Sequence, residues 1–226
     1  MTVVCFCYFL IKIHAFLYVQ ELVRFLIVNK FDSFKYNNNI IIHSNAKISS
    51  DVNVNIIGTD NVIDIGDSVI LRRLNINILG NNCKLIIKNN CSIRGAIHLR
   101  QNNSVIIIDS YTTSVSANIF SMEGSEINIG SNCMLSSSVY IRNSDEHPIY
   151  DLESNERINH AKPVFIGNNV WLCEGVTVNK GSIIPDGCVI GAKSFVSKEL
   201  KRKNSIYSGV PAQLIRENIK WDRTFK

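Results

Sequence analysis

The sequence predicts an all-β protein, a left-handed parallel β-helix with an N-terminal helix and a short C-terminal helical cap. The main observation is a six-residue repeat, which fits neither the period of an α-helix nor the alternation of a strand. Such a repeat is typical of a solenoid in which each hexapeptide forms one flat side of a coil. Aliphatic residues recur at every sixth position: Ile166, Leu172, Val178, Ile184, Ile190 and Val196. Small or β-branched residues follow each of the first five by four positions: Val170, Val176, Ser182, Cys188 and Ser194.

A longer repeat precedes the regular one. Gly66, Lys88, Asp109 and Gly130 fall in equivalent places, at intervals of 22, 21 and 21 residues. Each unit is slightly longer than three hexapeptides and corresponds to about one coil. We therefore expect a solenoid domain over residues 37–198, with irregular early coils from about residue 40 and regular coils after residue 127.

The N-terminal segment, residues 1–36, is predicted to be an apolar helix. Lys12, Glu21 and Arg24 interrupt it, which argues against a transmembrane span. It also lacks the charged start and the cleavage site of a signal peptide. Two interpretations stay open for residues 1–28: packing against the solenoid or a neighbouring subunit, and peripheral contact with the inner membrane.

One stretch interrupts the solenoid. The repeat runs through Ile129, Leu135 and Ile141, stops, and resumes at residue 164. We expect residues 143–162 to form a loop thrown out from one corner, and loops on rigid scaffolds often carry function. Beyond the solenoid, the tail 199–226 contains a turn at 209–212 and a predicted short helix at 212–220 that caps the open end.

Composition excludes several classes of protein. The seven cysteines form no C-x-x-C pair, and Cys133 and Cys188 occupy small inward positions of the repeat. This favours a reducing, cytoplasmic compartment and argues against a disulfide framework or a zinc site. No P-loop, G-x-S-x-G or nucleic-acid-binding module occurs. The net charge of +5 suits an anionic ligand but equally a slight lysine excess on the surface.

The loop contains the sequence D-E-H-P, residues 145–148. His147 is suited to act as a general base near neutral pH, and Pro148 restricts the backbone before it. Trp171 follows where the repeat resumes, and the coil length places both along one edge of the solenoid. The alternatives are an ordinary solvated histidine and a tryptophan that packs on the loop. Cations near the last coil, including Lys193, Lys198 and Lys201, suit either phosphate binding or a solvated tail.

Three motifs together resemble a known family. They are H-P followed by an arginine (His147, Pro148, Arg157), P-V-x-I-G-x-x-V-W at 163–171, and G-V-P-A at 209–212. These features resemble the hexapeptide-repeat acetyltransferases, and residues 141–172 look like the bacterial sialic-acid-capsule O-acetyltransferases. The similarity covers about residues 40–222 and is strongest at 127–191. Gln213 stands where the family often has a lysine after Pro-Ala.

The resemblance implies an acetyl-coenzyme A donor, no metal, and a homotrimer with active sites in the clefts between solenoids. His147 corresponds to the family's catalytic histidine and Trp171 to its active-site tryptophan. We expect a hydroxyl group of a bacterial capsular or surface polysaccharide, sialic-acid-containing polymers included, as the acceptor. The expected donor contacts are Trp171, Gly191, Lys193, Lys198 and Lys201, and the expected acceptor contacts are Tyr140, Arg142, Asp145 and Arg157.

Two alternative functions stay open. One is acetyl transfer to a small acceptor, such as an antibiotic or a free or nucleotide-linked sugar. The other is a non-catalytic scaffold, but a purely structural solenoid has no reason for a long loop that carries D-E-H-P. Stabilisation by acetyl-coenzyme A separates the enzyme from the scaffold.

Overall fold

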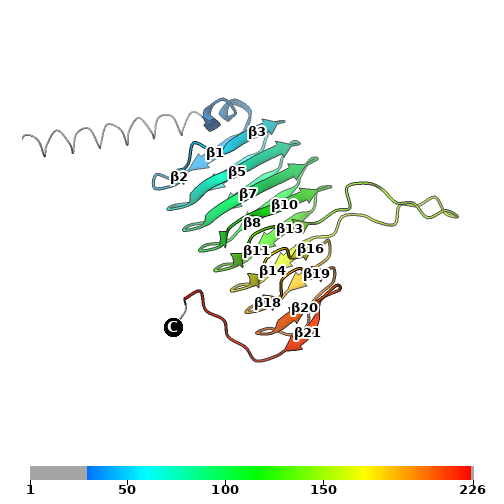
Figure 1. Ribbon diagram of the computed structural model, residues 1–226. Coiled ribbons are helices and arrows are strands. Elements are labelled where there is room, and N and C mark those ends of the chain that lie inside the picture. The colour runs from blue at the N-terminus through cyan, green and yellow to red at the C-terminus, as the bar shows by residue number, and fades with distance from the viewer. Residues whose placement is uncertain (1–29, 225–226) are drawn as a thin grey trace, which may run out of the picture.

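The structure is a computed structural model, and it describes residues 30–224 as a β-solenoid. Figure 1 shows the coils stacked along one axis, with each coil contributing short strands to three faces. The first face is a seven-stranded sheet, so the solenoid has about seven coils. Its strands are β1 (Asn39–Ile42), β4 (Val62–Ile65), β6 (Lys84–Ile87), β8 (Val105–Ile108), β11 (Glu126–Ile129), β14 (Val164–Ile166) and β17 (Ile183–Ile184).

The other two faces share one sheet, because the long strands β5 (Ile70–Leu79) and β7 (Ser92–Arg100) bend around a corner. On the second face they join β2 (Lys47–Ile48), β9 (Thr113–Ser114), β12 (Met134–Leu135), β15 (Trp171–Leu172), β18 (Val189–Ile190) and β20 (Ile206–Ser208). On the third face they join β3 (Asn53–Ile57), β10 (Ala117–Met122), β13 (Val139–Arg142), β16 (Thr177–Val178) and β19 (Phe195–Val196). We call the turns between faces one and two, two and three, and three and one the first, second and third corners.

The pairing register follows both sequence repeats. In the early coils Ile65 pairs with Ile87, which pairs with Ile108, so Gly66, Lys88, Asp109 and Gly130 each follow a first-face strand. In the late coils Ile166 pairs with Ile184, and Leu172 with Ile190. The predicted stacking of equivalent aliphatic residues is confirmed.

The interior holds the aliphatic residue of each hexapeptide together with the small residue at each corner. All six predicted aliphatic positions and all five predicted small positions are buried. The Ser182 hydroxyl has the carbonyl oxygens of Asn179 (2.6 Å) and Val196 (3.0 Å) within hydrogen-bond distance and donates its one proton between them, so this buried polar group is satisfied. Burial of this continuous apolar column is the main stabilising contribution to the fold.

The loop 143–162 leaves the third corner after β13 and returns at β14, and Figure 1 shows it as a projecting arm. Its start is anchored by the buried Asn143, whose side-chain oxygen accepts from the Met122 amide and whose NH₂ donates to Ser121. Farther out, Tyr150 and Arg157 form an antiparallel bridge. The loop is therefore a two-limbed arm with a hydrogen-bonded base.

The prediction of a C-terminal helix over 212–220 is wrong. Residues Gln213–Arg216 form strand β21, which pairs antiparallel with β20 through Tyr207 and Leu214. The last coil leaves β20 with an unpaired backbone edge, and a strand supplies the hydrogen bonds that this edge requires, whereas a helix cannot. A β-hairpin therefore closes this end of the solenoid.

At the other end, residues 30–32 are helical and η1 (Lys35–Asn37) is a short 3-10 helix. Phe31 is fully buried in the solenoid core. The rest of the predicted N-terminal helix, and with it the choice between packing and membrane contact for residues 1–28, lies outside the described residues. Between residues 30 and 224, no helix has the length and hydropathy needed to span a membrane.

Candidate active site

The base of the loop is held by a network around Asn159, which is 7% exposed. Its NH₂ group donates to the backbone oxygen of His147 (2.8 Å) and to Asp145 Oδ2 (3.1 Å). Its Oδ1 accepts from the backbone amide of Ile149 (2.7 Å). Asn159 thus ties the returning limb of the loop to the segment on both sides of His147.

Lys180, from the next coil, supports the same network. Its ammonium group pairs with Asp145 and donates to the carbonyl oxygen of Asn159 (3.0 Å). Burial by itself raises the pKa of Asp145, but hydrogen bonds from Lys180 and Asn159 outweigh it, so the pKa lies below its usual value. Asp145 is therefore an ionised anchor of the loop rather than a proton carrier near neutral pH.

A second ion pair joins the loop to the preceding coil. Arg157 Nη2 lies 2.8 Å from Glu123 Oε1, and the Ser144 hydroxyl donates to the same carboxylate. The Ala161 amide donates to Glu123 Oε2 (3.4 Å). The hydrogen bond from Arg157 is the main cause of the lowered pKa of Glu123. Arg157 and Asp145, both expected acceptor contacts, are thus engaged in holding the loop.

His147 lies between these anchors with an exposed side chain. Its backbone is fixed on both sides, because its amide donates to the backbone carbonyl oxygen of Asp145 (2.8 Å) and its own carbonyl oxygen accepts from the side chain of Asn159. A fixed backbone with an accessible imidazole is the arrangement that a general base for an incoming substrate needs.

The third face carries a column of stacked side chains beside the loop. The rings of His98 and Phe120 are 4.2 Å apart and nearly parallel, and Phe120 lies 5.1 Å from Tyr140. Arg100 lies over Phe120 (5.7 Å) and pairs with Glu146 of the loop (3.0 Å).

The expected acceptor residue Arg142 lies at the end of this column. Its guanidinium lies 5.8 Å from the ring of Tyr140, the other expected acceptor residue of this strand, and donates to Asn179 (3.1 Å). Sequence reasoning did not single out His98, Phe120 or Arg100. His98 is half-buried, and burial, followed by the charge of Arg100, lowers its pKa. His98, Phe120 and Arg142 are spaced 22 residues apart and pair with one another across neighbouring strands, so the spacing was a signal for their alignment.

Trp171 lies elsewhere, on the outer side of β15 in the second face. Its indole N–H donates to the Ser136 hydroxyl (3.0 Å), and its ring lies 5.9 Å from that of Trp221. The structure does not bring Trp171 and His147 together within one chain, because the loop leaves from the third corner.

The expected donor contacts are spread around the last coils. Gly191 and Lys193 lie at the second corner, just past β18, and Lys193 is 3.6 Å from Glu174. Lys198 follows β19 at the third corner. Lys201 pairs with Glu199, which bridges to Ile183 and so extends the first face. Gly191 and Lys193 are thus on the same side as Trp171, whereas Lys198 is nearer the corner that bears the loop.

The cysteines within residues 30–224 give no sign of a nucleophile. The five within residues 30–224 are free, and four of them are buried. Burial raises the pKa of each, to about 11 for Cys91 and Cys133. Cys173, close to Trp171, has its pKa raised by burial alone. In the same part of the chain, no group of three or more histidine, cysteine or acidic residues is placed to hold a metal ion.

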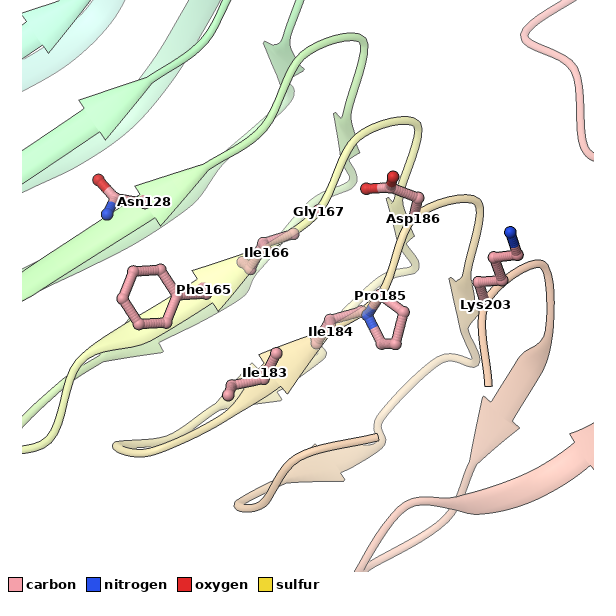
Figure 2. A pocket seen from close by; sticks show the side chains of 9 residues that line it. All are labelled: Asn128, Phe165, Ile166, Gly167, Ile183, Ile184, Pro185, Asp186 and Lys203. Carbon is pink, nitrogen blue, oxygen red and sulfur yellow. The ribbon is translucent and has the colours of Figure 1, made fainter. Parts of the chain in front are cut away.

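A groove of about 390 Å³ lies on the first face (Figure 2). Phe165, Ile183 and Pro185 give it an apolar floor, and Asp186 and Lys203 stand at its rim. The Asp186 carboxylate already accepts from the Asn168 amide (2.6 Å). No histidine lines the groove, and its one carboxylate is already engaged by the Asn168 amide, so the loop around His147 remains the candidate catalytic element.

Comparison with known proteins finds similar acetyltransferases, although no protein-family model matches the chain. A polysialic acid O-acetyltransferase of Neisseria meningitidis is 38% identical over 186 residues, 82% of this chain and 86% of that protein. An Escherichia coli polysialic acid O-acetyltransferase is 33% identical over 62% of this chain, but the match spans only 45% of that protein. The crystal structure of the polysialic acid O-acetyltransferase OatWY superimposes with a TM-score of 0.81, covering 84% of this chain and 90% of that one. That of the polysialic-acid-specific acetyltransferase NeuO gives 0.64 at 30% identity, covering 79% and 92%.

Proposed function

Because the chain belongs to the hexapeptide-repeat O-acetyltransferases, which use acetyl-coenzyme A, we propose that it O-acetylates sugar hydroxyls of a sialic-acid capsular polysaccharide. The observation that carries the proposal is the exposed imidazole of His147 on an internally braced loop. The names of the similar polysialic acid O-acetyltransferases of Neisseria meningitidis and Escherichia coli supply the acceptor.

In the proposed reaction His147 removes the proton from an acceptor hydroxyl while the oxygen of that hydroxyl attacks the thioester carbonyl carbon of acetyl-coenzyme A. The tetrahedral intermediate collapses, the carbon–sulfur bond breaks, and the imidazolium returns the proton to the departing thiolate. A backbone N–H or a side-chain donor near Trp171 stabilises the oxyanion. No acyl-enzyme is needed, and the raised pKa values of the cysteine thiols agree with that.

The site is proposed to form between subunits of a homotrimer of left-handed solenoids. His147 at the third corner and Trp171 on the second face point to different sides of one chain. A cyclic assembly brings the loop of one copy to the second face of the next, and it repeats that contact three times. One subunit then supplies the base and its neighbour the wall against which the acetyl group lies.

The donor is proposed to lie along the coil edge that contains Trp171, Gly191 and Lys193, with Lys198 and Lys201 near its phosphates. Gly191 follows β18, the coil neighbour of the Trp171 strand, and a side chain at this position would collide with that of Ser208. The lysine ammonium groups supply the point charges that phosphates attract.

The acceptor is proposed to contact Tyr140 and Arg142 on the third face, beside Phe120. None of the strand segments on this face contains an aspartate or glutamate, so the surface suits a polymer that carries carboxylates. Aromatic faces and guanidinium groups bind sugar rings and carboxylates respectively. Asp145 and Arg157 serve the acceptor indirectly, by fixing the loop.

We place the enzyme on the cytoplasmic side of the inner membrane, where residues 1–28 provide peripheral contact. The apolar character of that segment and the mainly buried free thiols support this location.

The test is transfer of labelled acetyl from acetyl-coenzyme A to a panel of polysialic acid, neutral polysaccharides, free sugars and an antibiotic, with products identified by mass. Label on polysialic acid is expected, with His147→Ala lowering the rate by about 10²–10⁴-fold. His160→Ala, a second exposed histidine of the same loop, is the matched control and should retain activity. Label on small molecules alone would favour the small-acceptor alternative. No label and no stabilisation by acetyl-coenzyme A would favour the scaffold.

A further inference from the structure

Residues 217–224 form a strap that runs back along the first corner from the end of the solenoid (Figure 1). The Ile219 amide donates to the Asn204 oxygen (2.9 Å) on the last coil. The indole N–H of Trp221 donates to the Asn169 oxygen (2.7 Å) at the corner that precedes Trp171. The strap therefore crosses successive coils in the direction opposite to their order in the sequence.

Arg223 fastens the free end of this strap to two earlier coils. Its guanidinium donates to Asn132 Oδ1 (3.1 Å) and to the Cys133 oxygen (2.6 Å). It also donates to Thr113 Oγ1 (2.8 Å) and to the Tyr111 oxygen (3.3 Å). A guanidinium presents several donors in a rigid fork, so one side chain fixes the strap against the corner at four points.

Between these two attachments, Trp221 covers one side of Trp171. The ring centroids are 5.9 Å apart with an interplanar angle of 43°, a tilted aromatic contact. At the second-corner side, the indole N–H of Trp171 is held by Ser136. Trp171 is thus clamped between a hydroxyl and a second indole, and its half-exposed remainder faces solvent.

We propose that Trp221 is a positioning residue for Trp171, which it holds in the orientation needed beside the acetyl group. This inference rests on the proposed function, which places Trp171 in the donor site. A displacement of about 1 Å of a group beside the reacting atoms can lower the rate on the order of 10²-fold. An indole of Trp171 that is held at two edges therefore differs functionally from one that is free to move. The signal is absent from the local sequence, because the two tryptophans are 50 residues apart.

The chain offers a clean spectroscopic readout, since these are its only two tryptophans. A tilted indole pair at this distance should give a coupled near-ultraviolet circular dichroism signal. We expect Trp171→Phe and Trp221→Phe each to remove that signal, and Lys220→Ala, an exposed neighbour in the strap, to leave it unchanged. Light scattering checks that every variant keeps the assembly of the wild-type protein.

Activity is measured with acetyl-coenzyme A and polysialic acid on the same variants. Trp221→Ala should lower kcat by about 5- to 50-fold and change the KM for the polymer by less than about twofold. Trp221→Phe, which keeps an aromatic ring at this position, should recover most of the wild-type kcat. Arg223→Ala, which releases the strap but keeps both indoles, should weaken the coupled signal and lower kcat in the same direction.

The outcomes separate the inference from the function on which it rests. If Trp171→Ala abolishes transfer while a folded Trp221→Ala keeps full kcat, the positioning role is wrong and the proposed function stands. If Trp171→Ala itself transfers normally, the donor role of Trp171 fails and the inference fails with it. A coupled signal that survives Trp221→Phe would show that the two indoles are not in contact in solution.

Discussion

The side chain of Asn159 offers the sharpest test of the idea that a braced loop makes His147 effective. Asn159→Ala removes the amide that bonds the His147 oxygen, the Ile149 amide and the Asp145 carboxylate. These three partners of the Asn159 carboxamide all belong to the loop, and none belongs to the solenoid core. The change should therefore act on the loop rather than on the fold.

The magnitude follows from the three shortest hydrogen bonds of this side chain, since the fourth, from Arg157 Nε to Asn159 Oδ1, is 3.3 Å long and weaker. Two neutral bonds are worth about 1 kcal/mol each, and the one to the carboxylate about 2 kcal/mol, so about 4 kcal/mol of local loop order is lost. This bounds the fall in the ordered population at roughly 10³-fold. The Lys180–Asp145 and Arg157–Glu123 pairs persist and keep part of the order. We therefore expect kcat to fall by about 10- to 100-fold.

The assay pairs initial rates on polysialic acid with thermal unfolding. The melting temperature should change by less than about 4 °C, because the loop opens locally without the core. Glu153→Ala, at an exposed position farther out in the loop, is the control and should leave both quantities unchanged. Proteolysis at the loop should be faster in Asn159→Ala than in either the control or the wild type.

Two results would refute the reasoning. Wild-type kcat in a loop shown by proteolysis to be loosened would mean that His147 needs no bracing. An equally lowered kcat with an unchanged proteolysis rate would mean that Asn159 touches the reactants directly and does not act through the loop.

Two further predictions concern other parts of the molecule. Gly95 has φ +120°, and an added Cβ would collide with the backbone of Ala117. Gly95→Ala should therefore destabilise the protein by about 3 kcal/mol or more, which would lower the midpoint of urea unfolding. Gly124→Ala is the control and should cost clearly less, because φ is +65° there and the nearest atom is 3.5 Å from the added Cβ. The pKa of Glu123 is lowered by the hydrogen bond from Arg157, so the stability that it contributes is present above its unfolded value of 4.5 and is lost as pH falls through the lower folded value. Glu123→Gln should therefore melt below the wild type at pH 7, and the two melting temperatures should converge below pH 4.5; a constant gap down to pH 3 would show that the ion pair does not stabilise the fold.

The repeat made the solenoid readable because every hexapeptide meets the same environment. An inward aliphatic residue and a small corner residue recur in each coil, so local sequence and global packing agree. The interrupting loop was visible for the same reason, as the place where that agreement stops. His147 could be proposed from residue type and position in this loop alone.

The C-terminal helix was predicted from local preference and failed because a tertiary requirement overrode it. Residues 213–216 pair with the exposed edge of β20, which exists only once the coils have stacked. Arg142 was expected as an acceptor contact, but its alignment with His98 and Phe120 was overlooked although the 22-residue spacing was in the sequence. The early coils vary in length, so a column at the surface shows itself only when the strand register is known.

The sequence by itself determined the solenoid, the position of the loop and the identity of the general base candidate, because periodicity and residue chemistry are properties of short segments. The tertiary structure alone decided that His147 and Trp171 lie on different sides of one chain, and that Trp221 packs on Trp171. These relations depend on how many residues each coil takes and where the tail runs. No local pattern encodes such distances, since they arise from the sum of all the coils between the two residues.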